Sequence, residues 1–407
     1  MTNQPTQPET DDTLISLPQN FQFGQVLPEG AALLGAEPEP PLGIALSRFT
    51  GTFSGPGFNT IFRPRSSVPD SGTAFPNPIP PGIPDDNVLE LNLTQETLSF
   101  TKALGSVPNR GLRAQADIFL NGVPYAQAVN DVTNNDTGRG DGAPVGIHFE
   151  PGLWMRVPAT ETQPVLGASL ARMASIPHGT TINAQGLEPA AATSGPPDIS
   201  PVGITPFVIG NPAERIHFAS QTASDAQTPR IPQDLTRFIE AGTITQAVLD
   251  DPTQVLRDVL ASQTVLDTVT FTVTTAPQLP EFGGGIDNIA FLEGDASRAQ
   301  PNANSVLMAS TFWIETVQHQ IVVPPYLPGQ PALKLSPAPT LPGLPVPVFE
   351  VTPPRELTES VTLTVTSTQI QYAQTVLLDF AGLSWPHVSV ATLVPEDPQT
   401  VPASAWA

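Results

Sequence analysis

Proline limits the fold of this chain more than any other residue type, because 49 of the 407 residues are prolines. A proline cannot donate a hydrogen bond to a sheet ladder, so most of these residues must lie in loops, sheet edges and tails. Eleven of them lie at 324–358, where an extended, semi-rigid chain is expected. We interpret 324–358 as a linker or a surface strap, and residues 1–42 as an N-terminal tail or arm.

Between the proline-rich segments, apolar residues recur at every second position, which is typical of half-buried strands. Alternate leucines at 88–93 share one strand face, and the longest alternating segment is 306–323. An Asn-Gly pair at 121–122 is typical of a hairpin turn. Residues 235–263 carry the one clear helical pattern, and short helices there would cover the mouth of a barrel.

The chain is strongly acidic, with 38 acidic and 16 basic residues and a formal net charge of −22. Such a chain repels phosphate groups, and no basic stripe reverses this locally, so we expect no nucleic-acid or membrane partner. The first 20 residues lack the basic and apolar regions of a secretory signal, and no apolar run approaches the roughly 20 residues of a membrane helix. We therefore expect a soluble, cytoplasmic protein.

Cysteine is absent, which excludes disulfides, thiolate metal sites and cysteine nucleophiles. A metal or haem ligand would then be a histidine, a tyrosine or a methionine. His319 is the first choice, because it shares a strand face with Trp313 and would enter an apolar interior. The competing interpretation is a hydrogen-bonded core histidine. No two of the five histidines have the short spacing of a zinc site; the other four are His148, His178, His217 and His387.

Two segments resemble the nitrobindin family, which consists of haem-binding barrels related to fatty-acid-binding proteins and lipocalins. Residues 51–61 resemble the opening G-x-W-x-G-x-G strand of that family, with Phe53 in place of the tryptophan. Residues 148–158 resemble its H-x-E-x-G-x-x-R segment, with one extra residue before Arg156. The chain is also similar to bacterial and fungal proteins labelled haem-binding, through three shorter segments at 176–179, 312–316 and 385–388.

This resemblance implies an antiparallel, calycin-like or lipocalin-like β-barrel that binds haem b. It places His148 on the distal side of the haem and the proximal ligand on a late strand, where His319 is the available histidine. Arg156 would pair with a haem propionate or, in the competing interpretation, form a salt bridge at the rim. We therefore expect His319 to bind the iron and the haem pocket to contain His319, His148, Arg156, Trp313, Trp154, His178 and His217.

These observations predict a mainly β chain with four parts. A tail at 1–42 precedes a ligand-binding barrel at 43–323, whose helical insertion lies at 235–263. A proline-rich linker at 324–358 then leads to a C-terminal β-meander at 359–407.

Three functions are compatible with the sequence. The first is haem binding, with nitric oxide or peroxide handling. The second is a metal-free, lipocalin-like carrier of an apolar small molecule. The third is an assembly protein that forms a homo-oligomer through its proline-rich arms. The sequence has no G-x-S-x-G elbow and no phosphate-binding loop, so any enzymatic activity would depend on haem and be peroxidase-like or peroxynitrite isomerase-like.

Overall fold

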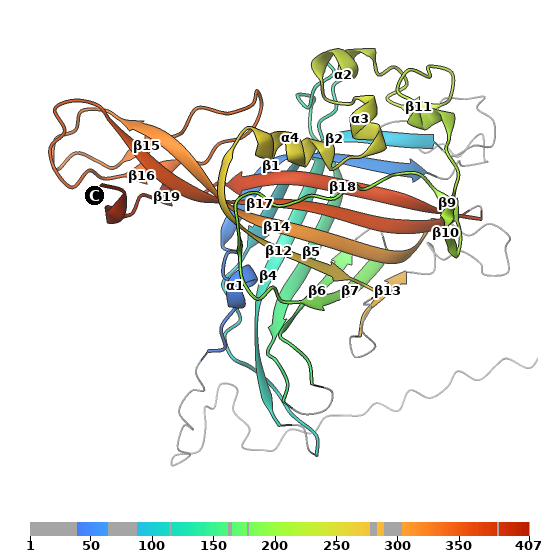
Figure 1. Cartoon of the computed structure of the whole chain (residues 1–407), viewed down its shortest axis with the longest axis horizontal. Coiled ribbons are helices and arrows are strands. Elements are labelled where there is room, and N and C mark those ends of the chain that lie inside the picture. The colour runs from blue at the N-terminus through green and yellow to red at the C-terminus, as the bar shows by residue number, and fades with distance from the viewer. Residues whose placement is uncertain are drawn as a thin grey trace, which may run out of the picture. The chain divides into compact units, whose positions relative to one another are not determined.

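Ten antiparallel strands form a closed β-barrel in the computed structural model of the chain (Figure 1). The structure describes residues 39–63, 88–113, 116–161, 165–176, 179–276, 283–288, 303–380 and 382–406. Strands account for 52% of the structure and helices for 9%, so the predicted mainly β, calycin-like architecture is confirmed at the level of the barrel. In order around the barrel, the strands are β1 (Gly51–Arg63), β2 (Val88–Phe100), β4 (Ile118–Asp131), β5 (Val145–Val157), β6 (Ser169–Ile176), β7 (Thr180–Leu187), β12 (Thr264–Thr274), β14 (Asn304–Val323), β17 (Val361–Phe380) and β18 (Leu383–Pro395).

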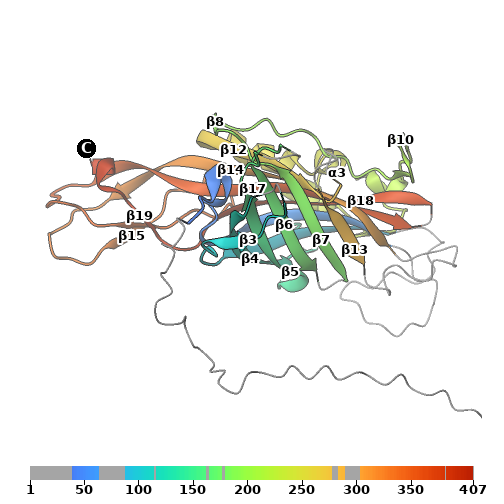
Figure 2. The same cartoon turned by 90° about the horizontal axis from the view of Figure 1, so that it is seen from below.

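The barrel closes where β18 pairs with β1, in a register that runs from Phe53↔Pro395 to Thr60↔Val388. Neighbouring strands β4, β5, β6 and β7 lie side by side in Figure 2. The seam between β7 and β12 is the narrowest, with the single pair Gln185↔Thr274. Beside it, β13 (Gly285–Asn288) pairs with β7. Each of the ten strands thus has a paired neighbour on both sides, which limits pairing with other chains.

Short elements complete the structure. A 3-stranded sheet consists of β15 (Leu333–Leu335), β16 (Phe349–Val351) and β19 (Gln399–Thr400). The remaining short strands are β3 (Val107–Asn109), β8 (Thr193–Ser194), β9 (Phe207–Val208), β10 (Asn211–Arg215) and β11 (Arg230–Ile231). The helices are α1 (Gly43–Leu46), α2 (Thr236–Ala241), α3 (Gln246–Asp250), α4 (Gln254–Ala261) and the 3-10 turns η1 (Ala219–Gln221) and η2 (Ala403–Trp406). None of the helices in the described part of the chain is long and apolar enough to cross a membrane.

An aromatic cluster fills part of the barrel interior. Phe49, which follows α1, stacks on Phe100 at a centroid distance of 4.4 Å. Trp154 meets Phe312 edge-on at 5.2 Å, and Phe271 stacks on Phe312 at 5.5 Å. Such rings each bury a large apolar area, so this part of the barrel is a packed core, and an open space can exist only in the remainder.

A second core lies on the outside of the barrel. Helices α2, α3 and α4 gather along one side of it (Figure 1), where Phe238 and Leu256 join a cluster with Phe62, Trp313 and Trp385. The helical stretch expected at 235–263 is therefore present, but it packs on outward-facing strand residues instead of covering the barrel mouth. The outer strand surface is apolar, and the helices bury it.

The sequence interpretation of 121–122 as a hairpin turn is wrong, because both residues lie inside β4 and pair with β5. The side chain of Asn121 donates to the carbonyl oxygen of Pro40 at 2.8 Å. A β-carbon at Gly122 would lie 2.5 Å from the carbonyl oxygen of Trp154. The glycine therefore permits a close backbone approach within the sheet, which is the other common reason for glycine in a strand.

The predicted boundary after residue 323 also needs correction. The structure makes β17 and β18 barrel strands, and β17 pairs with β14 from Asn304↔Asp379 to Val323↔Val361. Residues 324–360 therefore form an excursion between two neighbouring strands and do not link two domains. The excursion packs on its own barrel, where Tyr326 and Phe349 cluster with apolar residues of β14 and β17.

Candidate functional site

A cavity of about 470 Å³ lies inside the barrel. Its walls combine apolar side chains with an unusual number of polar ones. The apolar wall includes Ile61, Val129, Ile176, Ile182, Ile286, Met308, Val376 and Leu378. The polar wall includes Asn59, Arg63, Glu90, Asn92, Glu96, Gln127, Asp131, His148, Tyr372, Gln374, His387 and Ser389.

Strand alternation explains how polar residues reach this interior. On β2, Glu90, Asn92 and Glu96 line the cavity, whereas Leu89 and Leu91 belong to the outer core. Successive side chains of a strand point to opposite faces. Both faces of β2 are thus buried. The face with the leucines lies on the outside of the barrel, and the face with the polar residues lies inside it.

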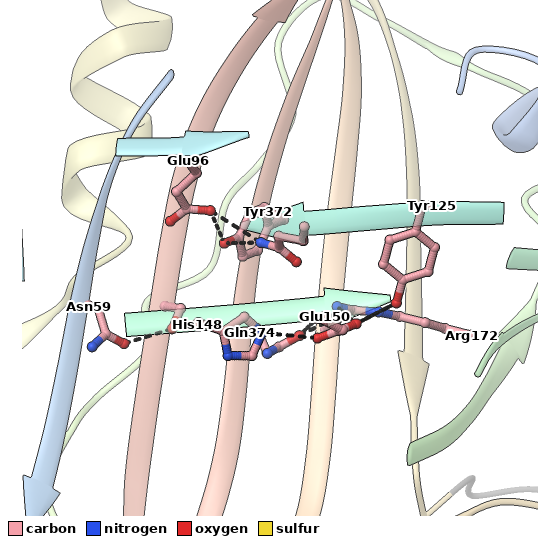
Figure 3. A network of polar contacts seen from close by, with 11 residues as sticks. Asn59, Glu96, Tyr125, His148, Glu150, Arg172, Tyr372 and Gln374 are labelled. Carbon is pink, nitrogen blue, oxygen red and sulfur yellow. Dashed lines mark hydrogen bonds and ion pairs between the residues drawn. The ribbon is translucent and has the colours of Figure 1, made fainter. Parts of the chain in front are cut away.

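Arg172 and Glu150 form a buried ion pair beside the cavity (Figure 3). Arg172 Nη2 lies 2.7 Å from Glu150 Oε1, and the two side chains are 2% and 0% exposed. The guanidinium also donates to the hydroxyl of Tyr125, at 2.9 Å, and to the side chain of Gln374, at 2.8 Å. Tyr125 in turn donates to Glu150. All members of this network are held by partners on other strands, which fixes their orientation.

The electrostatics of Glu150 follow from this pairing. Burial alone would raise its pKa, but the charge of Arg172 and hydrogen bonds from His148 and Tyr125 outweigh burial and lower the pKa from 4.5 to about 2. Glu150 is therefore ionised at neutral pH. The full positive charge of Arg172 balances it, as a buried charge requires.

Glu96 is the second buried carboxyl group. Its side chain accepts hydrogen bonds from Thr94 at 3.0 Å, from Gln127 at 3.2 Å and from the Tyr372 hydroxyl. Gln127 also donates to that hydroxyl at 2.9 Å. Burial raises the pKa of Glu96, and the three hydrogen bonds offset only part of the increase. Unlike Glu150, this carboxyl group has no arginine beside it in the described part of the chain.

A chain of polar contacts continues along the wall. His387 Nε2 lies 2.7 Å from Asn59 Oδ1, which Ser389 also contacts at 2.8 Å. Asn59 donates to Asn92 at 3.1 Å, and Asn92 donates to Asp131 at 3.2 Å. Because asparagine oxygens only accept, His387 donates from Nε2 here.

Two glycines make room for these side chains. A β-carbon at Gly57 would lie 2.6 Å from Glu96 Oε1, and one at Gly152 would lie 2.5 Å from the ring of Tyr125. Gly57 lies in β1 and Gly152 lies in β5. Their role in this chain is steric, since any larger residue would displace the groups of the polar network.

Of the residues that the sequence singled out, His148 is the one that the structure places in the cavity wall. Its Nε2 lies 3.3 Å from Glu150 Oε2. His387, which the expected haem pocket did not include, is also in the wall. His178 lies outside the described residues.

His319 is not among the residues that line the barrel cavity. It lines a separate space of about 280 Å³, where its Nε2 lies 2.9 Å from Ser367 Oγ and its ring lies 5.7 Å from that of Phe349. Burial lowers its pKa from 6.5 to about 4. The strand face that His319 shares with Trp313 points outward into the second core, so the expectation that it enters the barrel interior is corrected. Both faces of β14 are buried from Phe312 to Glu315, and alternation alone could not distinguish them.

The other expected pocket residues serve structural contacts. Arg156 pairs with Glu188 at 2.8 Å, close to Gly43 of α1. Trp154 belongs to the aromatic core inside the barrel, and Trp313 belongs to the outer core. His217 is exposed and lies 3.4 Å from Thr222. None of these four lines the cavity.

Sequence reasoning missed most of the site, namely Glu96, Tyr125, Glu150, Arg172 and Tyr372. A usable signal was present around Arg172, the single charged residue of a strand that is otherwise uncharged. Such a residue is rarely buried unless it is paired. Within the described residues, no three histidine, aspartate or glutamate side chains gather as a metal site would require.

Comparison with protein-family models, with curated proteins and with solved structures finds no match to this chain. The barrel is compatible with a calycin-like fold. Its function therefore has to be argued from the cavity itself.

Proposed function

We propose that this protein binds a small organic molecule inside the barrel, without a metal. The observation that supports this most directly is the cavity of about 470 Å³, a volume within the range of roughly 300–1,000 Å³ typical of ligand pockets. Its lining of aliphatic side chains with a few fixed polar groups matches the usual composition of such pockets. The ligand would place an apolar body against the aliphatic wall and a polar group near Glu96, Gln127 and Tyr372.

The polar side chains of the cavity wall have fixed orientations, which favours ligand binding as their role over simple packing of the core. In the polar wall, Glu96, Gln127 and Tyr372 are already hydrogen-bonded to each other, so little ordering is needed when a ligand arrives. Apolar packing would have stabilised the fold at a smaller desolvation cost. A barrel of this size commonly encloses one small ligand.

A substitution that fills the cavity with a large side chain tests this proposal. Val376 lines the cavity, and Val376→Trp should fill it; Val322, which is 61% exposed, provides the matched control Val322→Trp. We expect the neutral fluorescent probe N-phenyl-1-naphthylamine to bind the wild type and Val322→Trp, and to bind Val376→Trp at least about tenfold more weakly, the equivalent of about 1.4 kcal/mol. Equal binding by all three proteins would place the probe elsewhere and count against the cavity.

Haem is a second candidate, supported by the position of His148. Its Nε2 is engaged by Glu150, and metal-bound histidines commonly donate their other ring nitrogen to a carboxylate in this way. His148 would then be the residue that holds the iron, and the proposed chemistry would be the handling of nitric oxide or peroxide. Nitrobindin-like segments of the sequence support the same proposal.

Reconstitution with haemin separates the two candidates. Haem binding should give a Soret band that His148→Ala weakens and His319→Ala leaves intact, because His319 lies outside the cavity. A colourless protein after reconstitution would reject haem and leave the metal-free proposal standing.

A further inference from the structure

The charges that face the cavity are not balanced. Four carboxylates belong to the cavity wall or to the network beside it, and two of them are paired with arginine. Arg63 lies 2.9 Å from Glu90, and Arg172 lies 2.7 Å from Glu150. The other two carboxylates are Glu96 and Asp131, and no ion pair to either occurs among the described residues.

Asp131 is satisfied only by neutral donors. Its Oδ2 accepts from the amide of Asn92 at 3.2 Å, and its Oδ1 accepts from the backbone N–H of Thr133 at 2.9 Å. Glu96 likewise accepts only from neutral donors, namely Thr94, Gln127 and Tyr372. Both carboxylates line the cavity. An interior cavity with two acidic groups, neither of them paired with an arginine or lysine among the described residues, favours a ligand that brings a positive charge itself.

We propose that the ligand is an organic amine, with a protonated nitrogen directed at Glu96 and Asp131 and an apolar body on the aliphatic wall. This rests on the proposed function and specifies its ligand. The ring of Tyr372, which lines the same wall, is of the kind that attracts cations. A carboxylate-bearing ligand would instead meet like charges, which costs binding energy.

The cavity volume sets the scale of the body. A volume of about 470 Å³ lies in the lower half of the range of roughly 300–1,000 Å³ that is typical of ligand pockets, so a small organic body fits. A metal cation is a poor alternative, since no cluster of three ligand side chains exists in the described part of the chain. A linear ten-carbon amine is therefore a suitable probe.

A matched series of probes tests the inference by calorimetry on the full chain at neutral pH. The series is n-decylamine, n-decanol and n-decanoate, which differ only in the head group. We expect n-decylamine to bind about tenfold more tightly than n-decanol, and n-decanoate to bind most weakly. The two substitutions Glu96→Gln and Asp131→Asn should each reduce the amine preference severalfold.

The control distinguishes the cavity from the overall acidity of the chain. Asp117→Asn removes the same charge from an exposed residue outside the cavity and should leave the preference unchanged. If n-decanol or n-decanoate binds as tightly as n-decylamine, the amine inference is wrong while the proposed carrier function stands. If none of the three probes binds, the proposed function itself fails. Because the wild-type series needs no variant, a misfolded Glu96→Gln protein does not weaken the test.

Discussion

Arg172 is the residue on which the interior of this barrel depends. Its guanidinium pairs with Glu150, and its carbon Cζ lies 5.7 Å from the ring centroids of Tyr125, Trp154 and Phe312. It therefore joins the aromatic core to the polar layer beside the cavity. A buried ion pair of this kind adds little over an apolar pair, but removing one partner leaves the other charge without compensation.

Replacing Arg172 by methionine should therefore destabilise the protein by about 3–5 kcal/mol at neutral pH. The matched control is Arg110→Met, because Arg110 is 88% exposed and also pairs with an aspartate, at 3.1 Å; exposed pairs contribute little. Urea denaturation of the three proteins measures the difference. Equal free energies of unfolding for both variants would contradict a buried, uncompensated Glu150.

The pH dependence of Arg172→Met provides a further readout for the same variant. In the wild type, the pKa of Glu150 is lowered from 4.5 to about 2, so its stabilisation is complete above about pH 4.5 and is lost as the pH falls toward 2. Without Arg172, burial dominates and the pKa of Glu150 rises. Acidification from pH 7 to pH 4.5 should then stabilise the variant, because protonation removes the buried charge.

At the level of elements, the sequence predicted most strands and the helical segment, because period-two and period-3.6 patterns depend on local geometry. It did not predict which strand face points inward. β2 buries most of both faces, and β14 buries both faces around Trp313. The His319 face of β14 was therefore placed on the wrong side. Sidedness depends on contacts distant in sequence, and alternation does not encode them.

Dependence on long-range contacts also explains why the predicted domain boundary after residue 323 was wrong. A proline-rich segment is typical of a linker, yet 324–360 leaves and re-enters one sheet between β14 and β17. The polar site could not be predicted either, since Glu96 and Tyr372 are 276 residues apart in the sequence. His148 could be singled out because the local segment 148–158 is recognisable in the sequence without long-range contacts.

Removal of β17 and β18 should abolish the fold. A chain that ends at residue 323 exposes the edges of β14 and β1 and loses apolar residues from all three cores. We expect it to lack a cooperative thermal transition and to bind no probe. A chain that ends at residue 397 keeps all ten barrel strands and should retain both properties. Cooperative unfolding of the shorter chain would show that the C-terminal strands are dispensable to the barrel.

For the whole molecule, the dominant electrostatic fact is a net charge of −22. The ion pairs in the described residues, such as Arg172–Glu150 and Arg156–Glu188, compensate charge locally and leave this excess in place. Self-repulsion of a net charge destabilises the compact state. It also raises the concentration of cations near the surface, which favours delivery of a positively charged ligand to the cavity.

Sodium chloride should therefore stabilise this protein. Raising the salt from about 10 mM to about 1 M shortens the Debye length from about 30 Å to about 3 Å, which screens repulsion between distant surface carboxylates. The buried Arg172–Glu150 pair is screened far less, because water and ions are excluded from it. Calorimetry should show a melting temperature that rises steadily with salt, most steeply below about 0.1 M. A melting temperature that falls with salt would mean that exposed ion pairs stabilise the protein more than its net charge destabilises it. Binding of n-decylamine would then depend on Glu96 and Asp131 more than on the net charge of the whole protein.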